Sequence, residues 1–438
     1  MPTMPIAELH EISEPETPGL PIAATIPPAR FATLAHRDFR WLLFMQFAST
    51  MRMPTLFITQ AWWVNENAPE GQRVVMLGLL AALRGSAFLA YVLFGGTFAD
   101  RFPRATVLAI SHIAGLASVL LVGGLLFIPA VDGGEGMWLW VMLLLFASFG
   151  LMTAQDQPTR TAMIRDSVPE PLLSRAITQH QMVMSLALLA AAPLVGLSIE
   201  RFGFAVTYLL AGFGHAAVLF AITRISKTSA SDPDAAHESV LQNLRQGVAA
   251  LRADPIVRWT VFSNWALTAL GMSVMGILVA AWIDDILELD ASGWGVMMIF
   301  WGVGGLIASS WLSWRADLRH TGLWFLGAAA LMGLGVLGFG LSRIVILAFL
   351  FNGLVGFAYQ FVLTLGVTIV QRQVPNRLLG RVMGLLLLAG GLMQIAGLVV
   401  GAIAQAIGLE VVYPAAGILM LVYVALLFLR QRPLRQLD

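Results

Sequence analysis

The sequence predicts an all-α integral membrane protein whose 12 transmembrane helices form two six-helix pseudo-repeats. Three observations predict this fold class: the composition, a series of long apolar segments, and a sequence element that occurs once in each half. Of the 438 residues, 58% are hydrophobic and only 12% are charged. Soluble globular chains carry about 25% charged residues, so this chain has too few to cover a surface in water. The composition therefore indicates a membrane protein.

The apolar segments have the length that membrane crossing requires. A helix needs about 20 apolar residues to cross a bilayer core of about 30 Å. Lipid offers no hydrogen bonds to an open backbone, so each segment should be helical. The predicted helices span 40–63, 74–99, 105–128, 137–158, 175–199 and 204–223 in the first half, and 257–283, 292–314, 320–341, 344–370, 379–405 and 410–430 in the second.

The repeated element begins the fifth and the eleventh predicted helix. It reads Val-Pro-Glu-Pro-Leu-Leu-Ser-Arg at 168–175 and Val-Pro-Asn-Arg-Leu-Leu-Gly-Arg at 374–381. The two copies share Val-Pro, Leu-Leu and the final Arg at the offset that six helices require. Duplication of a six-helix unit is a common property of transporter folds, so the sequence predicts two related halves.

Polar segments mark the domain boundaries. The long polar connection places Leu241, Leu244, Val248 and Leu251 on one helical face, which predicts an amphipathic helix on the membrane surface; an ordinary solvated linker is the alternative. The proline-rich start of the chain predicts a disordered tail. The predicted units are a cytoplasmic N-tail (1–38), an N-terminal bundle (39–223), the linker (224–256), a C-terminal bundle (257–430) and a cytoplasmic C-tail (431–438).

The basic residues predict the orientation in the membrane. Of the 26 lysines and arginines, Arg52 and Arg84 fall within predicted spans and Arg73, Arg201 and Arg343 fall on one side. All others lie on the side of the termini, which the positive-inside rule assigns to the cytoplasm. We therefore expect a multi-pass protein of the bacterial inner membrane with both termini in the cytoplasm.

Several function classes are disfavoured by what the sequence contains. The net charge of +1 gives no basic excess for nucleic acid, and the absence of cysteine removes thiolate chemistry. The single lysine, Lys227, is not part of a glycine-rich phosphate loop, so no ATPase of that type is recognisable. We expect no enzyme activity, no catalytic or metal site and no cofactor. We expect an ion gradient, in our interpretation one of protons, to drive the protein.

The segment between the second and third predicted helices carries the strongest motif. Residues 95–104 read Gly-Gly-Thr-Phe-Ala-Asp-Arg-Phe-Pro-Arg and resemble the signature of the major facilitator superfamily, Gly-x-Leu-Ala-Asp-Arg-x-Gly-Arg. The resemblance implies a cytoplasmic gate in which Asp100 holds the start of the eleventh helix and Arg101 and Arg104 latch the two halves together. Gly96 belongs to the same motif, and Asp156 is within reach of the latch. A plain positive-inside turn is the alternative interpretation.

Further segments are similar to one branch of this superfamily. His-Arg-Asp-Phe-Arg at 36–40, Pro-Thr-Arg at 158–160 and Gly-Arg-Val-Met-Gly at 380–384 resemble enterobactin exporters and macrolide-efflux proteins. Ala-Pro-Leu-Val-Gly at 192–196 is similar to an element associated with antiporters. Pro193 and Gly196 have a second interpretation, in which they only kink the helix and permit close packing.

Charged residues inside the predicted spans indicate the substrate site, because such residues usually face a cavity. Arg52 and Arg84 lie in the middle of their helices, and we expect no acidic residue at their depth to neutralise them. This predicts an electropositive N-terminal half that receives an anionic amphiphile; for each arginine a structural role is the alternative. Helices that line the cavity, as the resemblance implies, add the candidate contacts Gln46, Gln60, Asn264, Asn352, Tyr359 and Gln360.

Histidine offers a further route to proton linkage. We consider only His180 for this role, and a buried His without a coupling function is the alternative. His112 and His215 fall on the third and sixth predicted helices, which the resemblance places at the periphery, so we expect no functional role for them.

The resemblance implies a secondary active transporter that works by alternating access. We expect efflux of a small amphiphilic compound, anionic and siderophore-like or drug-like, by proton-coupled antiport. An importer or a lipid-moving (lysophospholipid) transporter of the same fold is the alternative, followed by a membrane sensor or enzyme. The expected partners are a small-molecule substrate and the lipid bilayer, and the expected oligomeric state is a monomer.

Overall fold

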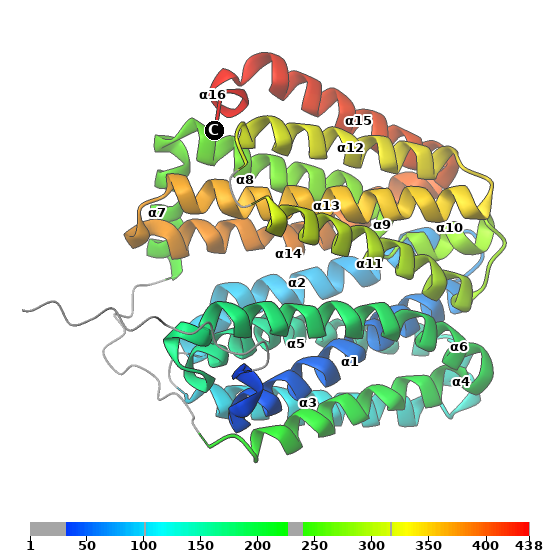
Figure 1. The fold of residues 1–438 in the computed structure, drawn as a ribbon. Coiled ribbons are helices and arrows are strands. Elements are labelled where there is room, and N and C mark those ends of the chain that lie inside the picture. The colour runs from blue at the N-terminus through cyan, green and yellow to red at the C-terminus, as the bar shows by residue number, and fades with distance from the viewer. Residues whose placement is uncertain (1–31, 100–101, 227–239, 316–317, 438) are drawn as a thin grey trace, which may run out of the picture.

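The computed structural model describes residues 32–99, 102–226, 240–315 and 318–437, and their regular structure is entirely helical. The helices form two bundles that lie side by side, with the N-terminal half below and the C-terminal half above in Figure 1. This confirms the predicted fold class. The predicted N-tail falls mostly outside the described residues, as does the middle of the linker.

The N-terminal half contains six helices of four or more turns when α6 is counted as two. Its elements are α1 (Arg37–Asn67), α2 (Arg73–Ala99), α3 (Arg104–Leu125), α4 (Pro129–Asp132), α5 (Trp138–Ser167) and α6 (Leu173–Ile222), with short 3₁₀ turns at Ala32–Ala35 and Glu170–Leu172. α6 consists of two helices joined at Gly203, whose φ of 76° is not helical. Glycine tolerates this conformation because it has no Cβ atom, so the chain reverses between the predicted fifth and sixth spans.

The C-terminal half begins with a broken helix. Its elements are α7 (Val240–Ala253), α8 (Pro255–Leu267), a π-helical turn (Thr268–Met272), α9 (Ser273–Met275), α10 (Val279–Asp285), α11 (Ala291–Trp314), α12 (Thr321–Leu341), α13 (Val345–Gln373), α14 (Asn376–Ile407), α15 (Leu409–Arg430) and α16 (Arg432–Arg435). The predicted span over 257–283 agrees with one membrane-crossing segment, Pro255–Asp285, but this segment is not one continuous helix as expected. The helix breaks at Gly276, whose ψ of −109° is not helical, and glycine weakens a helix at such a position.

Ten helical segments of the described residues are long and apolar enough to cross a membrane. One of them, Arg175–Ile222, covers both parts of α6. The 31-residue α1 is not among the ten, because polar side chains in its middle lower its hydropathy. With α1 added and α6 counted twice, the pattern fits the predicted twelve spans.

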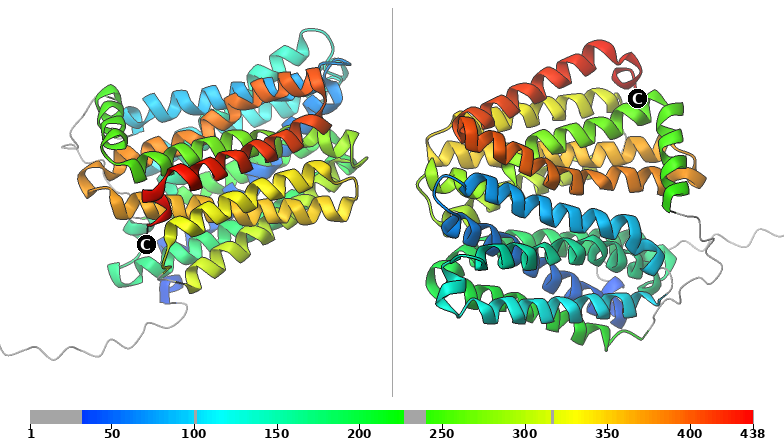
Figure 2. Two further views of the ribbon diagram at one scale, coloured as in Figure 1. Left: turned by 90° about the horizontal axis from the view of Figure 1, so that it is seen from above. Right: turned by 180° about the vertical axis from the view of Figure 1, so that it is seen from behind.

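The two halves meet along two pairs of long helices. α2 packs on α14, as the right view of Figure 2 shows, and the first part of α6 packs on α11. Inside the halves, α1 packs on α6, α2 on α5, α11 on α13 and α12 on α15. We call the end of the molecule that carries residues 64–73 and 284–292 the closed end, because the halves are bonded there, and the opposite end the terminal end. Both ends of the described chain lie at the terminal end, on the left of Figure 1.

The described part of the linker contains a helix where the amphipathic helix is predicted; its place on the membrane surface stays a prediction, and Val248 of the predicted apolar face is 37% exposed. α7 lies at the terminal end and packs against α14 and α8. Leu251 is buried, whereas Arg245 and Arg252 on its other faces are exposed. The helix therefore forms because one apolar side can pack on the bundle.

Candidate functional site

A cluster of charged side chains lies buried inside the N-terminal half. Arg52 of α1 donates from Nη2 to Asp156 Oδ2 of α5 at 2.9 Å, and Arg160 Nη1 donates to Asp156 Oδ1 at 2.7 Å. Arg52 is 2% exposed, Asp156 5% and Arg160 3%. The hydroxyl of Ser49 also donates to Asp156. Two guanidinium groups therefore face one carboxylate away from water.

Two histidines extend this cluster across the bundle. His112 of α3 places Nε2 at 3.2 Å from Asp156 Oδ1, and its Nδ1 lies 3.1 Å from Nδ1 of His215 on α6. A neutral His112 that donates to the carboxylate must accept a hydrogen bond from His215. His215 Nε2 then has no partner among the described residues. Asp156, His112 and His215 thus form a chain of groups along which a proton can pass, whereas the arginines keep their protons.

This geometry corrects three expectations. Asp156 neutralises Arg52, so the prediction that no acidic residue is available to this arginine was wrong. Asp156 does not reach Arg104, because it is directed into the bundle, where two arginines stabilise its charge. The histidines of α3 and α6 are not peripheral, since both rings point inward and pack against each other with centroids 5.0 Å apart.

The depth of these residues along their helices could have revealed the cluster. Each of the five lies about two to four helical turns from the terminal end of its helix. Helices that pack together within one half bring residues of similar depth into contact. The sequence motif around Asp156 gives no information on how deep this residue lies in the bundle, so the motif placed Asp156 near the gate.

Arg84 forms a second buried group in the N-terminal half. Its Nη2 donates to Gln60 of α1, and its guanidinium lies 5.2 Å from the ring of Phe57 and 5.1 Å from that of Phe149. Gln60 in turn donates to the Tyr208 hydroxyl at 2.7 Å. No carboxylate of the described residues forms an ion pair with Arg84, and its Nε and Nη1 have no partner there. Arg52 and Arg84 were both predicted to lack an acidic partner, and among the described residues this holds for Arg84 alone.

The remaining candidate contacts do not converge on one point. Gln46 donates to Thr50 on its own helix at 3.0 Å, and Gln360 donates to Thr364 at 3.1 Å. Asn352 donates to the Met297 carbonyl at 2.9 Å, which joins α13 to α11. Tyr359 packs on Trp301 with centroids 5.7 Å apart, and Asn264 is buried on α8 beside Gly366. His180 is also buried, and its Nε2 has no partner among the described residues.

Ion pairs join the halves at the closed end. Arg73 Nη1 of α2 donates to Asp284 Oδ2 of α10 at 2.8 Å, and its Nη2 donates to Asp285. Asn65 Nδ2 also donates to Asp284 Oδ2, at 2.9 Å. These side chains are partly exposed, so water weakens the attraction without removing it. They hold the two halves together in this conformation.

A capping carboxylate adds a further contact at this end. Asp290 precedes α11 and accepts hydrogen bonds from Gly293 N at 2.9 Å and from the Ser292 hydroxyl at 2.7 Å. Partial burial raises the pKa of Asp290, but these hydrogen bonds outweigh it and leave the pKa below its ordinary value. Glu200 of α6 accepts from Ser292 N at 2.9 Å, so the start of α11 is held by carboxylates from both halves.

The predicted gate is only partly visible. Asp100 and Arg101 lie outside the described residues, and Gly96 lies within α2. Arg104 Nη1 donates to Asp166 Oδ2 at 3.1 Å and to the Ala162 carbonyl at 3.2 Å. Both partners belong to α5, so in this structure Arg104 joins two helices of one half and does not latch the halves together.

The segment around Pro193 lies where the two halves touch. A Cβ atom on Gly196 would collide with the Ala291 carbonyl of α11, and one on Gly295 would collide with the Ala192 carbonyl of α6. Glycine at both positions lets the two backbones approach closely. The geometry therefore favours the interpretation in which Pro193 and Gly196 permit close packing, here between the two halves.

The architecture and the signature segment agree with one protein family. The family model of the Major Facilitator Superfamily matches residues 41–398 of the chain. The chain belongs to the major facilitator superfamily. It is thus a transporter and not an enzyme, and the resemblance inferred from the sequence is confirmed.

Two curated members of the superfamily are similar over most of their length. The multidrug efflux pump Tap of Mycolicibacterium fortuitum is 26% identical over 390 residues, which cover 85% of this chain and 90% of Tap. The enterobactin exporter EntS of Escherichia coli K12 is 27% identical over 371 residues, or 82% of this chain and 85% of EntS.

Solved structures of the superfamily share the fold. The peptide transporter POT in complex with sulfate has a TM-score of 0.71 at 14% identity, with 92% of this chain and 95% of POT covered. An inward-facing bacterial homologue of the lysosomal transporter Spinster has a TM-score of 0.66 at 14% identity, with 91% and 97% covered. At this identity the likeness concerns the fold alone.

Proposed function

We propose that this protein is a secondary active exporter of small anionic amphiphiles that exchanges its substrate for protons by alternating access. The observation that carries the proposal is the buried cluster in which Arg52 and Arg160 share the single carboxylate of Asp156. An uncompensated charge away from water is unfavourable by several kcal/mol. An anionic group near Arg52 or Arg84 lowers this energy, whereas a cation raises it.

The chemistry of the cluster supports proton coupling. Among the described residues, Asp38 and Asp156 are the buried carboxylates, and Asp38 lies at the terminal end, where Ser226 donates to it. Asp156 alone is placed within the bundle, next to two histidines that can relay a proton. Protonation of Asp156 would release its hold on Arg52, which could then bind an anionic substrate. Competition between carboxylate and substrate for one arginine is a simple basis for exchange.

The contacts of the closed end support alternating access. Arg73 bonds to Asp284 and Asp285 from the opposite half, while Gly196 and Gly295 allow the halves to pivot on closely packed backbones. We assign the closed end to the outer side of the inner membrane, because the arginines concentrate near the termini. In this assignment the halves are bonded to each other on the outer side, which is the conformation in which an exporter takes up its substrate from the cytoplasm. The names of Tap, an efflux pump, and EntS, an exporter, favour the same direction.

The proposal is tested with purified protein in liposomes, with enterobactin as the anionic probe and ethidium as the cationic one. An imposed pH gradient should drive the transport of enterobactin against its concentration gradient. Asp156→Asn should lower the rate of this transport at least tenfold. Asp166→Asn is the matched control, because Asp166 lies on the same helix but pairs with Arg104 at the surface. Equal transport by both variants contradicts the assigned role of Asp156, and transport of ethidium alone contradicts the anionic substrate.

A further inference from the structure

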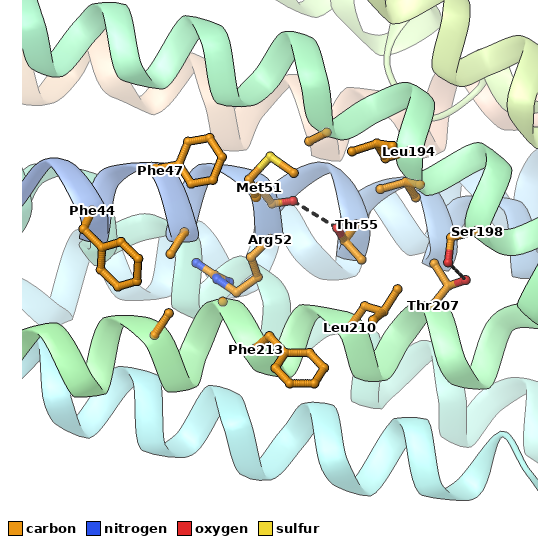
Figure 3. Close-up of a pocket in the computed structure, with 15 residues that line it drawn as sticks. Phe44, Phe47, Met51, Arg52, Thr55, Leu194, Ser198, Thr207, Leu210 and Phe213 are labelled. Atoms are coloured by element: carbon orange, nitrogen blue, oxygen red, sulfur yellow. Dashed lines mark hydrogen bonds between the residues drawn. The ribbon is translucent and has the colours of Figure 1, made fainter.

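A pocket of about 390 Å³ lies on the side of the N-terminal half, between α1 and the two parts of α6. Figure 3 shows Phe47 and Met51 of α1 on one side, Leu194 from the first part of α6, and Leu210 and Phe213 from the second part. The volume lies within the range of small-molecule sites. The pocket is therefore large enough to hold a ligand.

The pocket opens toward the surrounding lipid. Phe47 is 45% exposed, Leu194 55% and Phe213 73%, although all three lie within membrane-crossing helices and Leu194 and Phe213 lie in the middle of the two apolar parts of α6. Side chains that are exposed at this depth of a membrane protein contact acyl chains. A ligand can therefore enter from the bilayer without passing between the two halves.

One charged side chain forms the inner wall of this apolar pocket. Arg52 lines it and is 2% exposed, and only its Nη2 atom has hydrogen-bond partners among the described residues, namely Ser49 and Asp156. Its Nε and Nη1 are buried without a partner. A buried donor without an acceptor costs about 1–3 kcal/mol, and more when it is charged. An acceptor in the pocket would remove this penalty.

The charges around Arg52 indicate which kind of acceptor group the pocket favours. No carboxylate is found among the described residues that line the pocket, and Arg160 already shares Asp156 with Arg52. The other polar side chains that line the pocket are hydroxyls with partners of their own: Thr55 donates to the Met51 carbonyl at 3.0 Å, and Ser198 and Thr207 bond to each other at 2.8 Å. The unsatisfied group is therefore the guanidinium, which pairs most strongly with an anion.

We propose that this pocket binds an anionic amphiphile from the bilayer, with its headgroup on Nε and Nη1 of Arg52 and its tail between the two parts of α6. The ligand class is a carboxylate or phosphate with an apolar chain. It can be a lipid of the membrane or the exported compound, which share this chemistry. The site itself does not depend on the direction or the coupling of transport, so it is tested by binding alone.

The experiment measures binding of parinaric acid, a fluorescent fatty acid, to the purified full-length protein in a neutral detergent. We expect saturable binding that dodecanoate displaces and dodecanol, which has no charge, does not. Leu194→Trp fills the opening and should weaken binding at least tenfold. Leu197→Trp is the matched control: Leu197 is 43% exposed on the same helix and is not among the lining residues, so this change should leave binding unaltered.

A second variant tests the headgroup contact. Arg52→Gln should also weaken binding at least tenfold, while Asp156 keeps its pair with Arg160, so the bundle is expected to fold. Displacement by dodecanol as effective as by dodecanoate overturns the proposal. Equal binding by Leu194→Trp and Leu197→Trp also overturns it. Displacement by enterobactin would identify the pocket as part of the export route, and its absence would identify a membrane lipid as the occupant; either result supports the site.

Discussion

Arg52 and Asp156, which are 104 positions apart in the sequence, bind each other at 2.9 Å inside the N-terminal half. Both residues are buried away from water. Asp156 also accepts from Arg160, and Arg52 also donates to Ser49. The pair therefore joins α1 to α5 through charge at a depth where charge is costly. It explains how an arginine is retained within an apolar helix.

Asp156→Asn should destabilise the protein more than Arg52→Gln and more than the double variant. Asp156→Asn leaves Arg52 and Arg160 without a carboxylate, and loss of one partner of a buried pair costs about 3–5 kcal/mol, whereas Arg52→Gln leaves Asp156 paired with Arg160. The double variant leaves only Arg160 charged, so its loss should be smaller than the sum of the single losses. Unfolding of the purified variants in detergent measures these changes. Strictly additive losses would contradict a direct interaction.

The ion pairs of the closed end should bias the conformation of the transporter. Arg73→Gln removes the bonds to Asp284 and Asp285, so the closed end should open in a larger fraction of molecules, by about two- to fivefold for a loss of up to about 1 kcal/mol. Arg343→Gln is the control, because Arg343 pairs with Glu410 within the C-terminal half.

Spin labels on introduced cysteines can report this change without labelling any other site, because the chain has no cysteine of its own. One label replaces Glu70 and another replaces Ile344, which lie at the closed end in opposite halves. A distance distribution that Arg73→Gln leaves unchanged, or that Arg343→Gln shifts equally, would disprove the role of the interhalf pairs.

The glycine contact between α6 and α11 should not tolerate a larger side chain. Gly196→Val places carbon atoms against the Ala291 carbonyl, and overpacking of this kind typically costs about 1–3 kcal/mol. Transport should fall sharply because the halves can no longer pack in this register. Gly124→Val is the control, since a Cβ at Gly124 meets no atom within 4 Å. Equal transport rates for the two variants would exclude the contact from the mechanism.

The pKa of Asp290 predicts a pH dependence of stability. A carboxyl group whose pKa is lowered in the folded state contributes stability above its unfolded pKa of about 3.9 and loses it as the pH falls through the folded pKa. Asp290→Asn can still cap α11 but carries no charge. Its melting temperature should lie below that of the wild type at pH 7, and the difference should shrink below about pH 4. A difference in melting temperature that does not change with pH would contradict a lowered pKa of Asp290 in the folded protein.

The sequence predicted the helices well because lipid imposes a simple rule on them. Length and hydropathy located most spans to within a few residues, although the helix predicted at 137–158 continues to Ser167. The glycine at 203 alone separates the two parts of α6. The broken helix at 268–278 was not predicted, because its residues are as apolar as those of an intact span. Packing, and not composition, decides where such a helix breaks.

The candidate site was predicted only in part. Arg52 and Arg84 were identified because charge in an apolar segment is visible in any sequence. Their partners were not, because Asp156, His112 and His215 come from three other helices and meet only when the bundle forms. Polar residues of the C-terminal half, such as Asn352, were proposed from their helix, although the direction of each side chain depends on packing.

The direction of transport is the most direct test of the account. Inverted and right-side-out membrane vesicles of cells that produce the protein are given enterobactin and a pH gradient, and accumulation is compared with the Asp156→Asn variant. We predict that inverted vesicles, acidified inside, accumulate the compound and that Asp156→Asn abolishes most of this uptake. Accumulation by right-side-out vesicles alone would contradict export, and accumulation that the variant leaves unchanged would contradict coupling through Asp156.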